Sequence, residues 1–130
     1  NRDRSETEIR TLQAMKTGAL LRYACRAGAI LSDASAEDVD RLTRFGEIIG
    51  LAFQLADDLL DLEASPEQTG KATGKDAAAG KATLVGLQGV EGVRQELNHL
   101  LVAACSLLEP YGDAAATLSS IAGYIAARKK

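Results

Sequence analysis

The stretch from about Ile48 to Leu62 constrains the fold more than any other part of the chain. Apolar residues recur along it at helical spacing and lie on almost every side of the expected helix. A helix that is apolar nearly all round belongs in an interior and not on a surface. Gln54, Asp57, Asp58 and Asp61 are polar residues within this apolar segment. The fold therefore has to cover this helix and also accommodate its carboxylates.

Composition favours a single all-helical domain. The chain has 130 residues, of which 46% are hydrophobic and 25% charged, and its net charge is -3. This length and hydrophobicity suit one domain with a core, and they exclude disorder and collagen-like repeats. Aromatic residues make up only 4% of the chain, whereas alanine and leucine, both good helix formers, dominate. No apolar run is long enough to span a bilayer, and the acidic balance argues against nucleic acid as a partner.

Two helix starts are visible in the first half of the chain. Ser5 and Glu8 form a capping-box pattern, which predicts a long helix from about Glu6 to Leu31. Ser35 with Asp38 then opens a second helix that reaches about Leu62. The residues expected to form the apolar side of the first helix are Ile9, Leu12, Leu20, Tyr23, Ala27 and Ile30.

The second half begins with a glycine-bearing stretch from Glu63 to Lys81, which we expect to be a long loop. Pro110-Tyr111-Gly112 should end a helix, and Asp113 should cap the next one. The helices expected here run from about Thr83 to Gln88, from Glu91 to Glu109 and from Asp113 to Ala127.

The aspartates carry the strongest chemical signal. On a helix, Asp57, Asp58 and Asp61 share one face at spacings of three and four residues, with Gln54 one turn away. Clustered carboxylates in an apolar segment repel one another, and a bound cation relieves that repulsion. Oxygen ligands favour Mg²⁺, which commonly bridges carboxylates and phosphates. The alternative is a solvated acidic stripe on the helix surface.

Basic and small residues give two further signals. Lys71, Lys75 and Lys81 follow the aspartates on the glycine-bearing loop, where ammonium groups could reach phosphate oxygens. Lys16-Thr17-Gly18 should interrupt the first helix, and this violation indicates either a site or a close helix crossing. Cys25 and Cys105 lie apart in apolar segments, so we expect buried structural thiols and a reducing cytoplasm.

Together these pieces resemble the trans-isoprenyl diphosphate synthases, the family of farnesyl and geranylgeranyl diphosphate synthases. Residues 50–61, GLAFQLADDLLD, are similar to the second aspartate-rich motif of that family. Residues 15–20, MKTGAL, are similar to its Lys-Thr helix break, and residues 70–83 are similar to the loop that follows the aspartates. The resemblance covers nearly the whole chain, including its basic end, and it implies an all-α helical bundle of the isoprenoid synthase type.

The resemblance also implies a reaction. An allylic diphosphate ionises while Mg²⁺ ions hold the departing diphosphate, and isopentenyl diphosphate attacks the carbocation to form farnesyl or geranylgeranyl diphosphate. By position, Asp57 and Asp61 would ligate metal, with Asp58 acting through metal-bound water. The diphosphate would be held by Lys16, Lys71 and Lys81, and the carbocation would be faced by Thr17 and Gln54.

One feature of the family is missing from the chain. Nothing in residues 1–130 supplies the first aspartate-rich motif, which the family carries on a facing helix. We therefore expect residues 1–130 to be the C-terminal portion of a single isoprenoid synthase domain, about half of a larger enzyme. Such a chain should be inactive alone, should need the N-terminal half to complete its site, and should occur as a cytoplasmic homodimer.

Three other interpretations of the sequence lead to different functions. A non-catalytic regulatory or scaffolding subunit of the same fold is the main alternative, although it has no physical need for the aspartates, Lys16, Thr17 and Gln54. A generic helical Mg²⁺-binding module leaves the order of the three motifs unexplained. Terpene cyclases share the fold but usually carry Asn, Ser and Glu as metal ligands on the corresponding helix, so the DDLLD sequence disfavours them.

Overall fold

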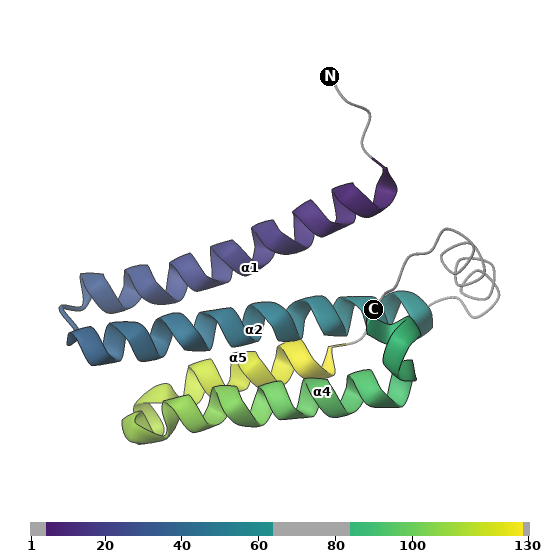
Figure 1. Cartoon of the computed structure of the whole chain (residues 1–130). Helices are drawn as coiled ribbons and strands as arrows, with labels where there is room; N and C mark the ends of the chain where they lie inside the picture. The colour runs from purple at the N-terminus through teal and green to yellow at the C-terminus, as the bar shows by residue number, and fades with distance from the viewer. Residues whose placement is uncertain (1–4, 64–83, 129–130) are drawn as a thin grey trace.

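The computed structural model describes residues 5–63 and 84–128, and within these ranges every regular element is a helix. Helix α1 spans Glu6–Leu31, α2 spans Ala36–Glu63 and α4 spans Leu84–Leu108. A 3₁₀ helix, η1, follows over Glu109–Ala115, and α5 spans Ala116–Ala127. Helix α2 lies in the middle, with α1 along one side and α4 and α5 along the other (Figure 1). The predicted all-α fold is confirmed.

Both predicted helix starts are formed as the sequence indicated. Ser5 and Glu8 make a reciprocal capping box, in which the Ser5 amide donates to the Glu8 carboxylate over 2.9 Å and the Glu8 amide donates to Ser5 Oγ over 3.3 Å. At the start of α2, the Asp38 amide donates to Ser35 Oγ over 3.1 Å. Such a cap stabilises a helix by about 1 kcal/mol because it satisfies an otherwise unpaired amide. The turn between the helices places Asp33 in the left-handed region, with φ 57°.

The break predicted between two helices near residue 90 is observed. It lies at Gly89 within the element α4, where φ 75° and ψ 167° are not helical and few residues other than glycine adopt that φ. The helix ends at Leu108, just before Pro110, as expected. The predicted Asp113 cap is wrong. Asp113 lies inside η1, and α5 begins after Ala115 with no side-chain cap because the chain enters it from a turn that is already helical.

Helices α1 and α2 meet through glycines. A Cβ at Gly46 would lie 2.8 Å from Cα of Arg22, and one at Gly50 would lie 3.0 Å from Cα of Gly18. We call this contact, centred on Gly18, Arg22, Gly46 and Gly50, the glycine seam. The predicted interruption of the first helix is wrong, because α1 runs through Lys16-Thr17-Gly18 without a break. The other explanation offered for that glycine, a close helix crossing, is observed.

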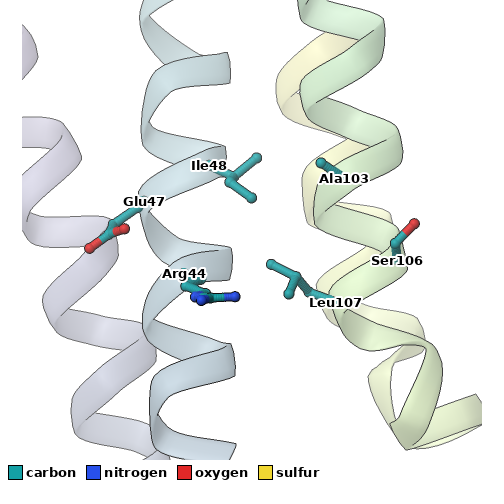
Figure 2. Close-up of a pocket in the computed structure, with 6 residues that line it drawn as sticks. All are labelled: Arg44, Glu47, Ile48, Ala103, Ser106 and Leu107. Atoms are coloured by element: carbon teal, nitrogen blue, oxygen red, sulfur yellow. The ribbon is translucent and has the colours of Figure 1, made fainter.

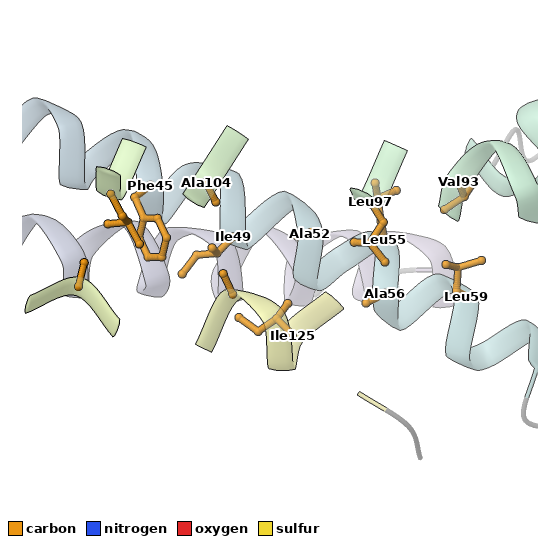
Figure 3. Close-up of a cluster of buried hydrophobic side chains, with 13 residues drawn as sticks. Phe45, Ile49, Ala52, Leu55, Ala56, Leu59, Val93, Leu97, Ala104 and Ile125 are labelled. Carbon is orange, nitrogen blue, oxygen red and sulfur yellow. The ribbon is translucent and has the colours of Figure 1, made fainter. Parts of the chain in front are cut away.

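The hydrophobic core lies on the opposite side of α2, between α2, α4 and α5. Phe45 of α2 and Val93 of α4 are fully buried. Side chains from the three helices meet there (Figure 3), and the core also reaches Ala115 in η1. The α2 residues that face this core are Phe45, Ile49, Ala52, Leu55, Ala56 and Leu59.

One expectation about burial is wrong. The second half of α2 is not interior on every side, since Leu51 is 55% exposed. The apolar side of α1, for which the sequence predicted only a helix, is largely exposed, with Leu20 at 65% and Tyr23 at 70%. Helix α1 contacts α2 through Gly18 and Arg22, and its Leu21 and Cys25 side chains pack against the core, whereas Leu20 and Tyr23 lie away from that contact. No helix in the described ranges is long and apolar enough to cross a membrane.

Candidate functional site

The aspartate segment occupies the last turns of α2. Leu55, Ala56 and Leu59 face the core, so the residues between them turn outward. Asp57 and Asp61 are exposed and Asp58 is half-buried. The expectation of a buried carboxylate cluster is therefore wrong for the described part of the chain, because α4 and α5 cover one side of this segment and leave the other open.

Asp57 already has a cationic neighbour. Nη2 of Arg128 donates to Asp57 Oδ1 over 3.0 Å. The same nitrogen donates to the main-chain carbonyl of Phe53 over 3.3 Å, and the guanidinium lies over the Phe53 ring, 3.9 Å from its centroid. Three contacts thus hold the Arg128 head group against the turn of α2 that carries Asp57.

Sequence reasoning did not single out Arg128 as a site residue. The available signal was the basic ending Arg128-Lys129-Lys130, which was read only as part of a family resemblance. Arg128 and Asp57 are 71 residues apart in the sequence, and they meet only because α5 packs on α2. Neither local periodicity nor motif spacing reports that closure.

Lys16 and Thr17 lie on α1 near the turn of α2 that precedes Gln54. The polar contacts Arg26 to Thr43, at 3.3 Å, and Arg22 to Glu47, at 2.9 Å, show that α1 and α2 run antiparallel. Gly18 follows in the same register opposite Gly50. Continuing that register places Thr17 and Lys16 opposite residues 51 and 52, about 3–5 Å along α2 before Gln54. The Lys16 side chain is exposed, Thr17 is half-buried and Gln54 is exposed.

The remaining predicted residues cannot be placed. Lys71, Lys75 and Lys81, and the loop that carries them, lie outside the described residues. The two cysteines are half-buried free thiols, so they are less deeply buried than expected. Burial raises the pKa of the Cys25 thiol, which disfavours its reactive thiolate form.

The donor set suits a hard divalent cation that keeps other ligands. Within residues 5–63 and 84–128, no three acidic, histidine or cysteine side chains converge to form a complete metal cage. Asp57 and Asp61 are one helical turn apart and both exposed, so they offer carboxylate oxygens from one side only. Mg²⁺ is commonly bound in this way, through one or two carboxylates with water and phosphate oxygens completing its shell.

Two of the hollows among the described residues lie at different levels along α2. The larger, about 450 Å³, lies between α2 and α4 near the Ser35 end, where Ile48 and Leu107 point toward each other across it (Figure 2). The smaller, about 270 Å³, adjoins Arg128 and is also lined by Leu59, Arg94 and Asn98. We associate the smaller hollow with the site because it borders the aspartate segment and carries basic and amide groups.

The Ser35 end of α2 has a polar contact of its own. The Tyr111 hydroxyl of η1 donates to Asp38 Oδ1 over 2.7 Å. Hydrogen bonds from Tyr111 and then from Ser35 lower the pKa of Asp38. Burial, followed by the bond to Asp38, raises the pKa of Tyr111 to about 12. This contact joins η1 to α2 far from the aspartates.

The fold and the site define an all-α protein with an accessible aspartate-rich helix. Residues 1–113 match the family model described as polyprenyl synthetase, and the chain belongs to that family. A dimethylallyltranstransferase of Fischerella ambigua (strain UTEX 1903) is 42% identical over 117 residues, covering 90% of this chain and 34% of the relative.

Two further relatives carry the names of neighbouring activities. A farnesyl diphosphate synthase of Bacillus subtilis (strain 168) is 41% identical over 98 residues, covering 75% of this chain and 33% of the relative. A geranylgeranyl diphosphate synthase of Cyanophora paradoxa is 38% identical over 128 residues, covering 96% of this chain and 43% of the relative. The chain therefore spans between 33% and 43% of the length of these relatives.

Proposed function

We propose that this chain provides one wall of a prenyltransferase site that condenses an allylic diphosphate with isopentenyl diphosphate to give farnesyl or geranylgeranyl diphosphate. The observation that carries the proposal is the placement of Gln54, Asp57 and Asp61 on the open side of α2 in a polyprenyl synthetase chain. The names of the relatives, which include farnesyl and geranylgeranyl diphosphate synthases, support this transferase class.

For the metal we propose Mg²⁺, held by Asp57 and Asp61 directly and by Asp58 through water. The exposure of Asp57 and Asp61 on one helix face supports this assignment. A bound divalent cation supplies positive charge that stabilises a departing diphosphate. The aspartates would hold that charge at the open end of α2.

For the substrate we propose that Lys16, Lys71 and Lys81 bind the allylic diphosphate. An ammonium group fixed near phosphate oxygens stabilises the negative charge that grows as the leaving group departs. Thr17 and Gln54 would face the carbocation with their oxygen atoms. The position of Lys16 and Thr17 within about one helical turn of Gln54 in the antiparallel register supports these roles.

We further propose that residues 1–130 form the C-terminal portion of one isoprenoid synthase domain, inactive alone, whose site is completed by an N-terminal part within a homodimeric enzyme. The relatives are about three times as long as the matched segment. The exposed apolar side chains of α1, such as Leu20 and Tyr23, are also consistent with a helical surface that other helices cover. A cytoplasmic location remains a prediction that the two free thiols suit.

The decisive experiment is prenyl transfer with labelled isopentenyl diphosphate and an allylic diphosphate in Mg²⁺, assayed for the 130-residue chain and for any longer product of its gene. We expect turnover in a longer product and none in the chain alone. Asp57→Ala should lower turnover roughly 10²-fold or more, because it removes a proposed ligand of the metal that stabilises the negative charge on the departing diphosphate. Asp113→Ala, at an exposed aspartate in η1, is the matched control and should leave the rate unchanged.

Two results would contradict the proposal. Full activity in Asp57→Ala would remove the metal assignment. Absence of product from every form, with the helices intact by circular dichroism, would instead favour the non-catalytic subunit.

A further inference from the structure

The position of Arg128 is set by the core. It is the residue directly after α5, and its extended backbone, with φ -60° and ψ 148°, leads away from the helix end. Ala122 and Ile125 of the same helix are buried against α2 and α4, so α5 delivers Arg128 to a fixed place. The contact with Asp57 therefore depends on the packing of α5 against the core.

The two partners of this ion pair differ in exposure. The side chain of Arg128 is 19% exposed, whereas that of Asp57 is 51% exposed. The Phe53 ring and carbonyl retain the guanidinium independently of the carboxylate. Nε of Arg128 is buried and has no hydrogen-bond partner among the described residues. A largely desolvated positive charge is thus held beside an accessible carboxylate.

This charge opposes a second cation at the same carboxylate. A divalent ion on Asp57 has to share the carboxylate with the guanidinium or displace it, and like charges a few ångströms apart repel. The hollow of about 270 Å³ beside Arg128 gives the head group room to move, with Asn98 in its lining as an alternative hydrogen-bond acceptor.

We propose that Arg128 is a positioning residue that occupies Asp57 in the cation-free protein and thereby weakens divalent-cation binding at the aspartate segment. The proposal rests on the proposed role of Asp57 as a metal ligand. As a consequence, a cation occupies the site only when the cation and its accompanying phosphate oxygens interact with Asp57 more favourably than Arg128 does.

The test is the affinity for Mn²⁺, measured by electron paramagnetic resonance on the 130-residue chain. Arg128→Gln should bind Mn²⁺ roughly three- to tenfold more tightly than the unmodified chain, because a unit charge about 5 Å away is removed. Arg22→Gln is the matched control. It removes the same charge from the ion pair with Glu47 on the glycine seam and should change the affinity less than about twofold.

Asp57→Asn separates the two proposals. It should weaken Mn²⁺ binding, and adding Arg128→Gln to it should then have no further effect. If Asp57→Asn weakens binding and Arg128→Gln alone does not tighten it, the role of Arg128 is wrong while the metal assignment stands. If Asp57→Asn binds Mn²⁺ as well as the unmodified chain, both are wrong.

A measurement on the unmodified chain guards against a variant that fails to fold. The ¹⁵Nε resonance of Arg128 should shift as Mg²⁺ is added, because its carboxylate partner is taken. An unchanged resonance at saturating Mg²⁺ would overturn the proposal. Arg128→Lys keeps the charge, so it should tighten Mn²⁺ binding less than Arg128→Gln does, and equal tightening by the two variants would also count against the proposal.

Discussion

The two sides of α2 are packed in opposite ways. Toward α1, Gly46 and Gly50 let the backbones approach until a single Cβ would collide with the neighbouring helix. Toward α4 and α5, large side chains such as Phe45 and Val93 fill the space between more distant backbones. The first contact depends on the absence of side chains and the second on their volume. Adding atoms should therefore destabilise the contact with α1, whereas removing atoms should destabilise the contact with α4 and α5.

The largest effect is expected on the core side. Phe45→Ala removes a fully buried ring and should lower the free energy of unfolding by about 3–5 kcal/mol, because transfer energy is lost and a cavity remains. Urea unfolding followed by circular dichroism measures this loss. Ile121→Ala, at a 41% exposed position of α5, is the control and should cost much less. Equal losses at the two positions would show that the core is misplaced.

An intermediate effect is expected on the glycine seam. Gly46→Ala places a Cβ 2.8 Å from Cα of Arg22, so α1 and α2 must move apart, at a cost of about 1–3 kcal/mol. The higher helix propensity of alanine offsets up to about 1 kcal/mol of that cost. Gly28→Ala in α1, where a Cβ meets nothing within 4 Å, is the control and should stabilise the chain. If both alanines stabilise, the seam is looser than described.

The smallest effect is expected at the polar contact on the core side of α2. Tyr111→Phe removes the 2.7 Å hydrogen bond to Asp38 and should lower the urea midpoint by roughly 0.2–0.5 M. Tyr124→Phe, at a 72% exposed tyrosine, should leave the midpoint unchanged.

The difference in urea midpoint between the unmodified chain and Tyr111→Phe should also depend on pH. The pKa of Asp38 is lowered in the folded chain, so its stabilisation is present above the unfolded value of about 3.9 and is lost as the pH falls through the lower folded value. The pKa of Tyr111 is raised to about 12, so its contribution is present below the unfolded value of about 10 and is lost as the pH rises toward 12. A midpoint difference that stays constant across both windows would contradict this assignment.

The sequence predicted what local chemistry determines. Serine caps placed the starts of α1 and α2, and proline and glycine placed the end of α4, because these signals act within a few residues. The aspartate spacing predicted one shared helix face for Asp57, Asp58 and Asp61, but that face is exposed at Asp57 and Asp61 and not buried as the sequence indicated. Their roles as ligands stay a prediction.

What the sequence did not predict depends on which helix lies beside which. Helical periodicity in α1 identified an apolar side but could not show which helix packs against it. In the structure α2 packs against the side of α1 that carries Gly18. A glycine beside Thr17 looked like a break because local propensity disfavours it, yet close packing on Gly50 keeps it within the helix. Arg128 escaped notice because only the docking of α5 brings it to Asp57.

The glycine seam also bears on the order in which the chain assembles during synthesis. It joins consecutive helices across a short turn at residues 32–35, so the pair can close as soon as α2 is complete. The core needs α4 and α5, and the bond between Asp57 and Arg128 must bridge 71 residues. A nascent chain should therefore hold α1 and α2 together while the core face of α2 is still bare. That interval is when the growing polypeptide is most exposed to aggregation and most dependent on chaperones.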